Sequence, residues 1–213
     1  ALFGGACVAC SGGRLQQREG GQYRVVLHHL LAQQPVHDAR VGLEEGALLF
    51  QRLTRDGGRT GQGDFADSMV EMDHRVGQIS DEIDRLGLRE DTLFIFCSDN
   101  GPEFRQPYRG TAGPWRGTYH TAMEGSLRVP FIARWPGRIQ AGRTSNEIMH
   151  VTDIFSTLAA VAGAAMPQDR PIDGLDQTAF LLGEPRSARE GFLFYIKDQL
   201  RAAKWRDWNG NWL

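Results

Sequence analysis

Apolar residues between positions 64 and 87 recur at alternating spacings of four and three, which predicts a long amphipathic helix. The stripe consists of Phe65, Met69, Met72, Val76, Ile79, Ile83 and Leu86. Asp64 is the expected N-cap, Asp67 suits the positive first turn, and Gly87 is the expected left-handed stop. Because the stripe is short for a coiled coil, it predicts a helix packed on a core.

The residues after this helix predict a buried strand, then further strands and one more helix. Residues 92–97 (TLFIFC) form an unbroken run, typical of a strand buried on both faces of a parallel sheet. Helix, short loop and buried strand in this order are half of a right-handed βαβ unit. Later segments predict a strand at 127–135, in which Pro130 indicates either a sheet edge or a strand start. They also predict a helix at 152–163 and antiparallel strands at 192–196 and 200–205. The pattern favours the α/β class with a small antiparallel carboxyl-terminal element.

The start of the chain is patterned unlike the rest. It is rich in Gly, Gln and Arg, and its apolar residues keep no sustained period. A glycine-rich connector at 57–63 precedes the helix. We therefore divide the chain into a poorly patterned, truncated or aberrant segment at 1–62, an α/β core portion at 63–165 and a carboxyl-terminal portion at 166–213. Because the first residue is Ala1, we expect the amino-terminal part of the fold, with any export signal, to be missing.

The composition predicts an ordinary soluble globular protein, with 41% hydrophobic and 23% charged residues. A formal net charge of −2 gives no basic field for nucleic acid or an anionic membrane, and the apolar runs are too short for a membrane span. Three cysteines exclude a disulfide framework. We interpret the Cys7–Cys10 spacing as incidental and Cys97 as a small buried hydrophobe. Cytoplasmic and periplasmic locations stay open, as does the oligomeric state.

The end of the predicted buried strand carries candidate chemistry. Asp99 and Asn100 stand side by side there, and Gly101 frees the backbone to turn. Open α/β sheets bind ligands just beyond the carboxyl ends of their strands, and oxygen donors suit Ca²⁺ or Mg²⁺. The same three residues also form a common turn. A metal site and a structural turn are therefore both open on the residues alone.

Several motifs in order around this turn closely resemble the carboxyl-terminal half of the sulfatase family. They are DNGPE at 99–103, WRGTY at 115–119, EGSLRVPFIARWPG at 124–137, DIFSTLA at 153–159, DGLD at 173–176 and AKW at 203–205. The preceding helix, from MDHRVG at 72–77 through DRLG at 84–87, resembles the same family. The resemblance implies an alkaline-phosphatase-like α/β sheet with flanking helices and an arylsulfatase-like sulfuric ester hydrolase. It covers the chain from about residue 63 to the end.

The resemblance also implies a site. It would hold one Ca²⁺ (or Mg²⁺), with Asp99 and Asn100 matching the family's later pair of metal ligands. The substrate would be a small-molecule or glycan sulfate ester, with the cation neutralising sulfate oxygens. Where many members carry a lysine, this chain has Tyr119, so Arg116 and His120 become the candidate contacts to sulfate.

The family's nucleophile is a formylglycine made from a Cys/Ser-x-Pro-x-Arg motif, and that motif is absent here. The closest string, CSGGR at 10–14, has glycine where proline belongs. The family's early pair of acidic metal ligands is not found either. We therefore expect this chain alone to be inactive. Two alternatives remain: a phosphate or phosphonate ester hydrolase of the same superfamily, and a non-catalytic remnant.

Overall fold

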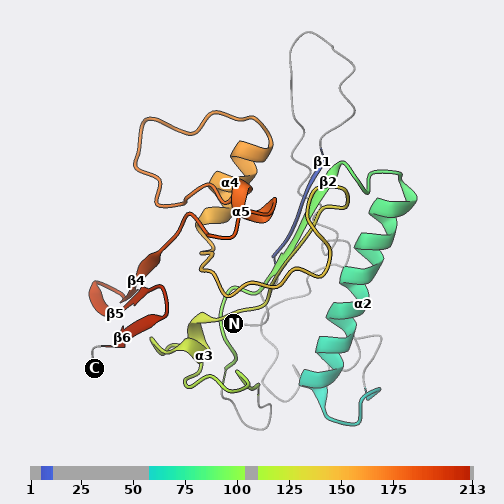
Figure 1. The fold of residues 1–213 in the computed structure, drawn as a ribbon. Helices are drawn as coiled ribbons and strands as arrows, with labels where there is room; N and C mark the ends of the chain where they lie inside the picture. The colour runs from blue at the N-terminus through green and yellow to red at the C-terminus, as the bar shows by residue number, and fades with distance from the viewer. Residues whose placement is uncertain (1–5, 12–57, 104–109, 212–213) are drawn as a thin grey trace.

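The computed structural model describes residues 6–11, 58–103 and 110–211, which form two three-stranded antiparallel sheets and four helices (Figure 1). In chain order the elements are β1 (Ala6–Ser11), α2 (Asp64–Arg85), β2 (Thr92–Cys97), α3 (Glu124–Leu127), β3 (Phe131–Arg134), α4 (Asp153–Val161), α5 (Thr178–Leu181), β4 (Gly191–Ile196), β5 (Gln199–Trp205) and β6 (Trp208–Asn211). None of the helices in these ranges is long and apolar enough to cross a bilayer.

The first sheet has β2 between β1 and β3, and it contains two fully buried apolar side chains. Leu93 and Ile95 of β2 have no exposed surface. Both neighbours of β2 run antiparallel to it, so the prediction of parallel neighbours and of a βαβ unit is wrong here. An unbroken apolar run indicates that both faces of a strand are covered, but covering a face does not depend on the direction of the adjacent strands.

Strand β1 lies in the segment that we interpreted as loose and poorly patterned. Its backbone pairs with β2 from Ala6 opposite Cys97 to Ser11 opposite Thr92. The backbone hydrogen bonds of β1 are made with β2, which is distant in sequence. Because no local pattern indicates this pairing, the sequence periodicity did not predict the strand. Residues 12–57, including most of the CSGGR string, lie outside the described residues.

Helix α2 confirms the predicted element and its stop signal. Gly87 has φ of 70°, and the amide of Leu88 donates to the carbonyl of Ile83 at 3.1 Å, the 6→1 bond of a Schellman motif. The N-cap is Gly63 rather than Asp64. Within the stripe Ile83 alone is buried, while Leu86 is 54% exposed. The helix runs beside the first sheet (Figure 1), so this face is a partly covered one rather than the continuous core we predicted.

Asp67 ties the connector before α2 to the helix. Its carboxylate is buried and accepts hydrogen bonds from the hydroxyl and amide of Thr60 at 2.6 and 2.9 Å, and from the amide of Gly58. These bonds, those from Thr60 first, hold the pKa of Asp67 below its ordinary value. The sequence singled out Asp67 for its place in the positive first turn, and the structure adds that it orders the loop ahead of it.

The second sheet is the predicted antiparallel element. Strands β4 and β5 pair from Gly191 opposite Trp205 to Ile196 opposite Gln199, with an irregularity at 194–195. Strand β6 extends this sheet, and sequence analysis missed it because WNGN is short and largely polar. The predicted helix at 152–163 is also present as α4, with Thr152 at its N-cap and Gly163 in a left-handed conformation just beyond it. The domain boundaries at residues 62 and 165 stay predictions.

Candidate functional site

The turn after β2 is held by backbone and side-chain hydrogen bonds. The Ser98 hydroxyl donates to the Asn100 carbonyl at 3.1 Å, and the Gly101 amide donates to the Ser126 carbonyl at 2.9 Å. A Cβ at Gly101 would stand 2.2 Å from the Gly125 carbonyl oxygen. Only glycine therefore permits this close approach between the turn and α3. The fold fixes the turn rather than leaving it as a free loop.

The two candidate metal ligands keep oxygens available on this turn. Asp99 is exposed, and within the described residues its carboxylate accepts no hydrogen bond and forms no ion pair. The Asn100 side chain donates through Nδ2 to the Gly101 carbonyl at 2.8 Å, which leaves its Oδ1 as an acceptor. A carboxylate and an amide oxygen suit Ca²⁺ or Mg²⁺, although such ions take six or more ligands. In the ranges that the structure describes, no three His, Cys, Asp or Glu side chains gather around one point.

Cys97, the last residue of β2, is buried as predicted. Burial, and secondarily the negative charge of Asp99, raise the pKa of its thiol above the ordinary value. Because the thiolate and not the thiol is the nucleophile, Cys97 acts as a small apolar side chain in the sheet.

The two candidate sulfate contacts lie on the loop that leads to α3, and both are exposed. His120 has φ of 66°, and its ring lies 4.0 Å from that of Tyr119 between centroids. The amide of Tyr119 donates to the carbonyl of Pro102 at 3.0 Å, which links the loop to the chain following the Asp99 turn. Neither Arg116 nor His120 lines the large cavity described next, so the structure does not bring them together with Asn100 there.

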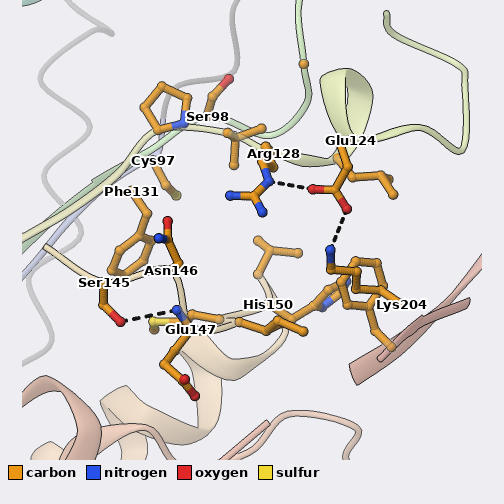
Figure 2. A pocket seen from close by; sticks show the side chains of 18 of the residues that line it. Cys97, Ser98, Glu124, Arg128, Phe131, Ser145, Asn146, Glu147, His150 and Lys204 are labelled. Carbon is orange, nitrogen blue, oxygen red and sulfur yellow. Dashed lines mark hydrogen bonds and ion pairs between the residues drawn. The ribbon is translucent and has the colours of Figure 1, made fainter. Parts of the chain in front are cut away.

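A cavity of about 670 Å³ opens between α3, β3, the chain before α4 and the second sheet. Ser98, Asn100 and Gly101 form one wall, so the cavity adjoins the candidate metal turn. Figure 2 shows Glu124 between Arg128 and Lys204 at one side, with the far end of the Arg128 guanidinium directed into the space. Apolar side chains from four elements line much of the remainder: Leu127, Phe131, Ile154 and Phe192. The cavity therefore combines apolar walls with a charged rim.

Glu124 is the centre of the charged rim. It accepts hydrogen bonds from Arg128 Nε at 2.5 Å, Lys204 Nζ at 2.7 Å and Asn209 Nδ2 at 3.1 Å. Burial alone would raise the pKa of Glu124, but the bonds from Lys204, Arg128 and Asn209 outweigh it and hold that pKa below the ordinary value. Glu124 is consequently an anion at neutral pH.

A comparison with the sequence profiles of protein families identifies the family of this chain. The profile described as Sulfatase matches residues 54–164, more than half of the chain and including the Asp99–Asn100 turn. The chain belongs to the sulfatase family.

Individual relatives agree with this family membership. This sulfatase-family chain is 44% identical to human (Homo sapiens) arylsulfatase A over 138 residues, covering 64% of the chain and 27% of that relative. It is 36% identical to steryl-sulfatase from Mus musculus over 162 residues, covering 73% and 26%. The crystal structure of the PsFucS1 sulfatase from Pseudoalteromonas sp. matches with a TM-score of 0.62 and 39% identity, over 67% of this chain and 29% of that one. The chain spans about a quarter of the length of these curated relatives, and the predicted sulfatase-like α/β fold class is confirmed.

Sequence reasoning named the motifs of this sulfatase-family chain but missed three side chains, two of which lie in those motifs. Lys204 was quoted within AKW without a role, and Asp153 only as a possible helix cap. His150 was not considered; it lines the cavity, and its Nδ1 lies 2.9 Å from the Thr152 hydroxyl. Burial, and then the charge of Arg189, lower the pKa of His150 below its ordinary value. A lone polar residue within a motif gives no signal of a partner 30 or more residues away.

Asp153 is fully buried at the start of α4 and gathers donors from three segments. Arg189 binds it in a bidentate pair, with Nε–Oδ2 at 2.9 Å and Nη2–Oδ1 at 2.5 Å. The Leu175 and His150 amides each donate at 2.9 Å, and Gln177 Nε2 donates at 3.1 Å. Desolvation would raise the pKa of Asp153, but the bond from Arg189 and then those from backbone amides outweigh it and hold that pKa below its ordinary value.

This lowered pKa predicts an acid-sensitive contribution to stability. A carboxyl whose pKa falls on folding stabilises the chain above its unfolded pKa, and the contribution is lost as pH falls through the folded pKa. We expect the free energy of unfolding in urea to decline below about pH 4, and Asp153→Asn to show a smaller decline over the same range. If both proteins lost stability in parallel on acidification, Asp153 would not be the titrating group.

Proposed function

We propose that this chain is part of a sulfuric ester hydrolase of the arylsulfatase type, whose complete form hydrolyses sulfate monoesters with a bound Ca²⁺ or Mg²⁺. The observation that carries the proposal is that the family match spans the Asp99–Asn100 turn at the end of a buried strand, where the two side-chain acceptor groups have no hydrogen-bond donor among the described residues. The names of the relatives, among them steryl-sulfatase and arylsulfatase A, support a sulfate ester as substrate.

Asp99 and Asn100 are the residues that would hold the cation, supplying one negative and one neutral oxygen ligand. When bound, a divalent cation supplies positive charge that stabilises negative sulfate oxygens. Among the chain's own residues, Arg116 can donate charged hydrogen bonds to an anion, and His120 can add a ring N–H. Both are solvent-accessible on one loop, so a sulfate ester can reach them without rearrangement of the core.

The nucleophile is the group that the 213 residues do not offer. No Cys/Ser-x-Pro-x-Arg string occurs in the sequence, and Cys97 is a buried thiol with a raised pKa. We therefore propose that the chain by itself binds a cation and an anion but does not turn over substrate. In family members the nucleophile is a formylglycine, and its place in the complete protein would lie outside the matched motifs of this chain.

The test uses the purified 213-residue chain with CaCl₂ and two matched substrates, 4-nitrophenyl sulfate and 4-nitrophenyl phosphate. We expect no hydrolysis of either above the buffer rate, together with Ca²⁺-dependent shifts of the Asn100 and Gly101 amides in ¹⁵N-correlated NMR spectra. Hydrolysis of the sulfate ester would overturn the proposed absence of the nucleophile while supporting the reaction type. Hydrolysis of the phosphate ester alone would favour the phosphoryl-transfer alternative over the sulfatase.

A further inference from the structure

Lys204 is an unusual cation in this chain. Only two of the 24 basic residues are lysines, Lys197 and Lys204. Lys204 lies on β5, its side chain is 10% exposed, and its ammonium is 2.7 Å from Glu124 Oε1 across 80 residues of sequence. A lysine buried to this degree needs a charged partner, and Glu124 provides it.

Glu124 links Lys204 to the loop that contains Arg116, through the backbone of the residue that follows it. The next residue, Gly125, donates its amide to the Arg116 carbonyl at 2.8 Å. A Cβ at Gly125 would come within 2.3 Å of the Gly117 carbonyl oxygen, so the two backbones are in direct contact. Because Glu124 is the first residue of the four-residue helix α3, fixing its side chain fixes the helix against the loop.

The other partners of Glu124 divide into local and distant ones. Arg128 is four residues away on the same segment, and its guanidinium lies 4.1 Å from the Trp115 ring, so it ties α3 to the start of the loop rather than to the second sheet. Asn209 reaches Glu124 from β6 as a neutral donor at 3.1 Å. Lys204 is thus the charged link between the second sheet and α3.

We propose that Lys204 is a positioning residue: through Glu124 and Gly125 it holds the segment at 115–123, with Arg116 and His120, in the conformation that meets the anion. The structural part stands on the contacts above, and the anion part rests on the proposed function. Lys204 acts indirectly, through Glu124, since it does not itself contact the candidate metal turn.

Lysine labelling tests the buried ion pair. With an amine-reactive acetyl ester at neutral pH, we expect Lys204 to react at least about tenfold more slowly than the exposed Lys197, as read by peptide mass spectrometry. In Glu124→Gln, the labelling of Lys204 should accelerate while that of Lys197 stays unchanged. Equal reactivity of the two lysines in the wild-type chain would overturn the pair.

Hydrogen exchange tests whether Lys204 holds the loop at 115–123 in place. In Lys204→Met we expect the Gly125 amide and its neighbours at 115–125 to exchange about tenfold faster or more, with α2 unchanged, whereas Lys204→Arg should retain protection. Lys197→Met, in the turn between β4 and β5, is the matched control and should have no effect. Unchanged exchange at 115–125 would overturn the positioning role. Equal acceleration at 115–125 and in α2 would also overturn it, because that result would indicate general destabilisation of the fold.

A sulfate titration separates this inference from the proposed function. We expect sodium sulfate to shift the Arg116 and His120 signals in NMR spectra of the wild-type chain, and Lys204→Met to weaken that binding about threefold or more. If sulfate shifts neither residue in the wild-type chain, the proposed anion contact fails, and hydrogen exchange still decides whether Lys204 holds the loop. If sulfate binds both proteins equally, the positioning role in anion binding is overturned.

Discussion

Asp153→Asn is expected to lower the free energy of unfolding by about 3–5 kcal/mol, because it leaves the Arg189 guanidinium buried without its counter-charge. The Arg189 side chain is 11% exposed and that of Asp153 is fully buried, so water cannot replace the lost partner. The amides of His150 and Leu175 would also lose a charged acceptor. Urea unfolding followed by tryptophan fluorescence measures the change, with unaltered native spectra as evidence of a folded variant.

The matched control for this prediction is Asp169→Asn. Asp169 pairs with Arg170 at 2.5 Å, but both side chains are more than 60% exposed. Exposed pairs contribute little, because water screens the attraction and solvates each charge when the pair is broken. We expect no measurable change in stability. A similar loss in the two variants would mean that the burial of Asp153 is not what makes its ion pair important.

Asp99→Ala is expected to abolish Ca²⁺ binding by the chain and, in a catalytically complete form, to lower kcat/KM by about 100-fold or more. Asp99 is the only charged ligand of the proposed pair, and a hard cation gains most from a carboxylate. The wild-type chain should bind weakly, with a Kd of about 1 mM or higher, since it offers two of at least six ligands. Calcium-induced shifts of the Asn100 and Gly101 amides measure the binding.

Two further variants sharpen the result for Asp99. Asp81→Ala removes an exposed carboxylate from α2 and should leave the Ca²⁺-induced shifts intact, which controls for net charge. Asp99→Asn keeps an oxygen ligand without its charge and should bind more weakly than the wild-type chain but not lose the site geometry. Wild-type shifts in Asp99→Ala would contradict the ligand assignment.

Elements α2 and β2 show most clearly how much of the fold the local sequence pattern predicts. The four-three spacing placed α2, and Gly87 placed its end, because a helix face and a left-handed stop each depend on residues close in sequence. The apolar run placed β2, since burial on both faces of a strand favours apolar side chains. The same local signals could not reveal that β1 and β3 run antiparallel to β2. Strand direction is set by the path of the chain between strands.

The candidate site divides in the same way. The sequence by itself determined the sulfatase family and the Asp99–Asn100 turn, because these depend on an ordered set of contiguous motifs. Only the tertiary structure decided that Lys204 meets Glu124 and that Arg189 meets Asp153, at separations of 80 and 36 residues. The sequence around a charged residue does not indicate its ion-pair partner, because the partner is defined only when the fold buries both side chains together. The cost of burying an unpaired charge then makes the pairing a property of the packed chain.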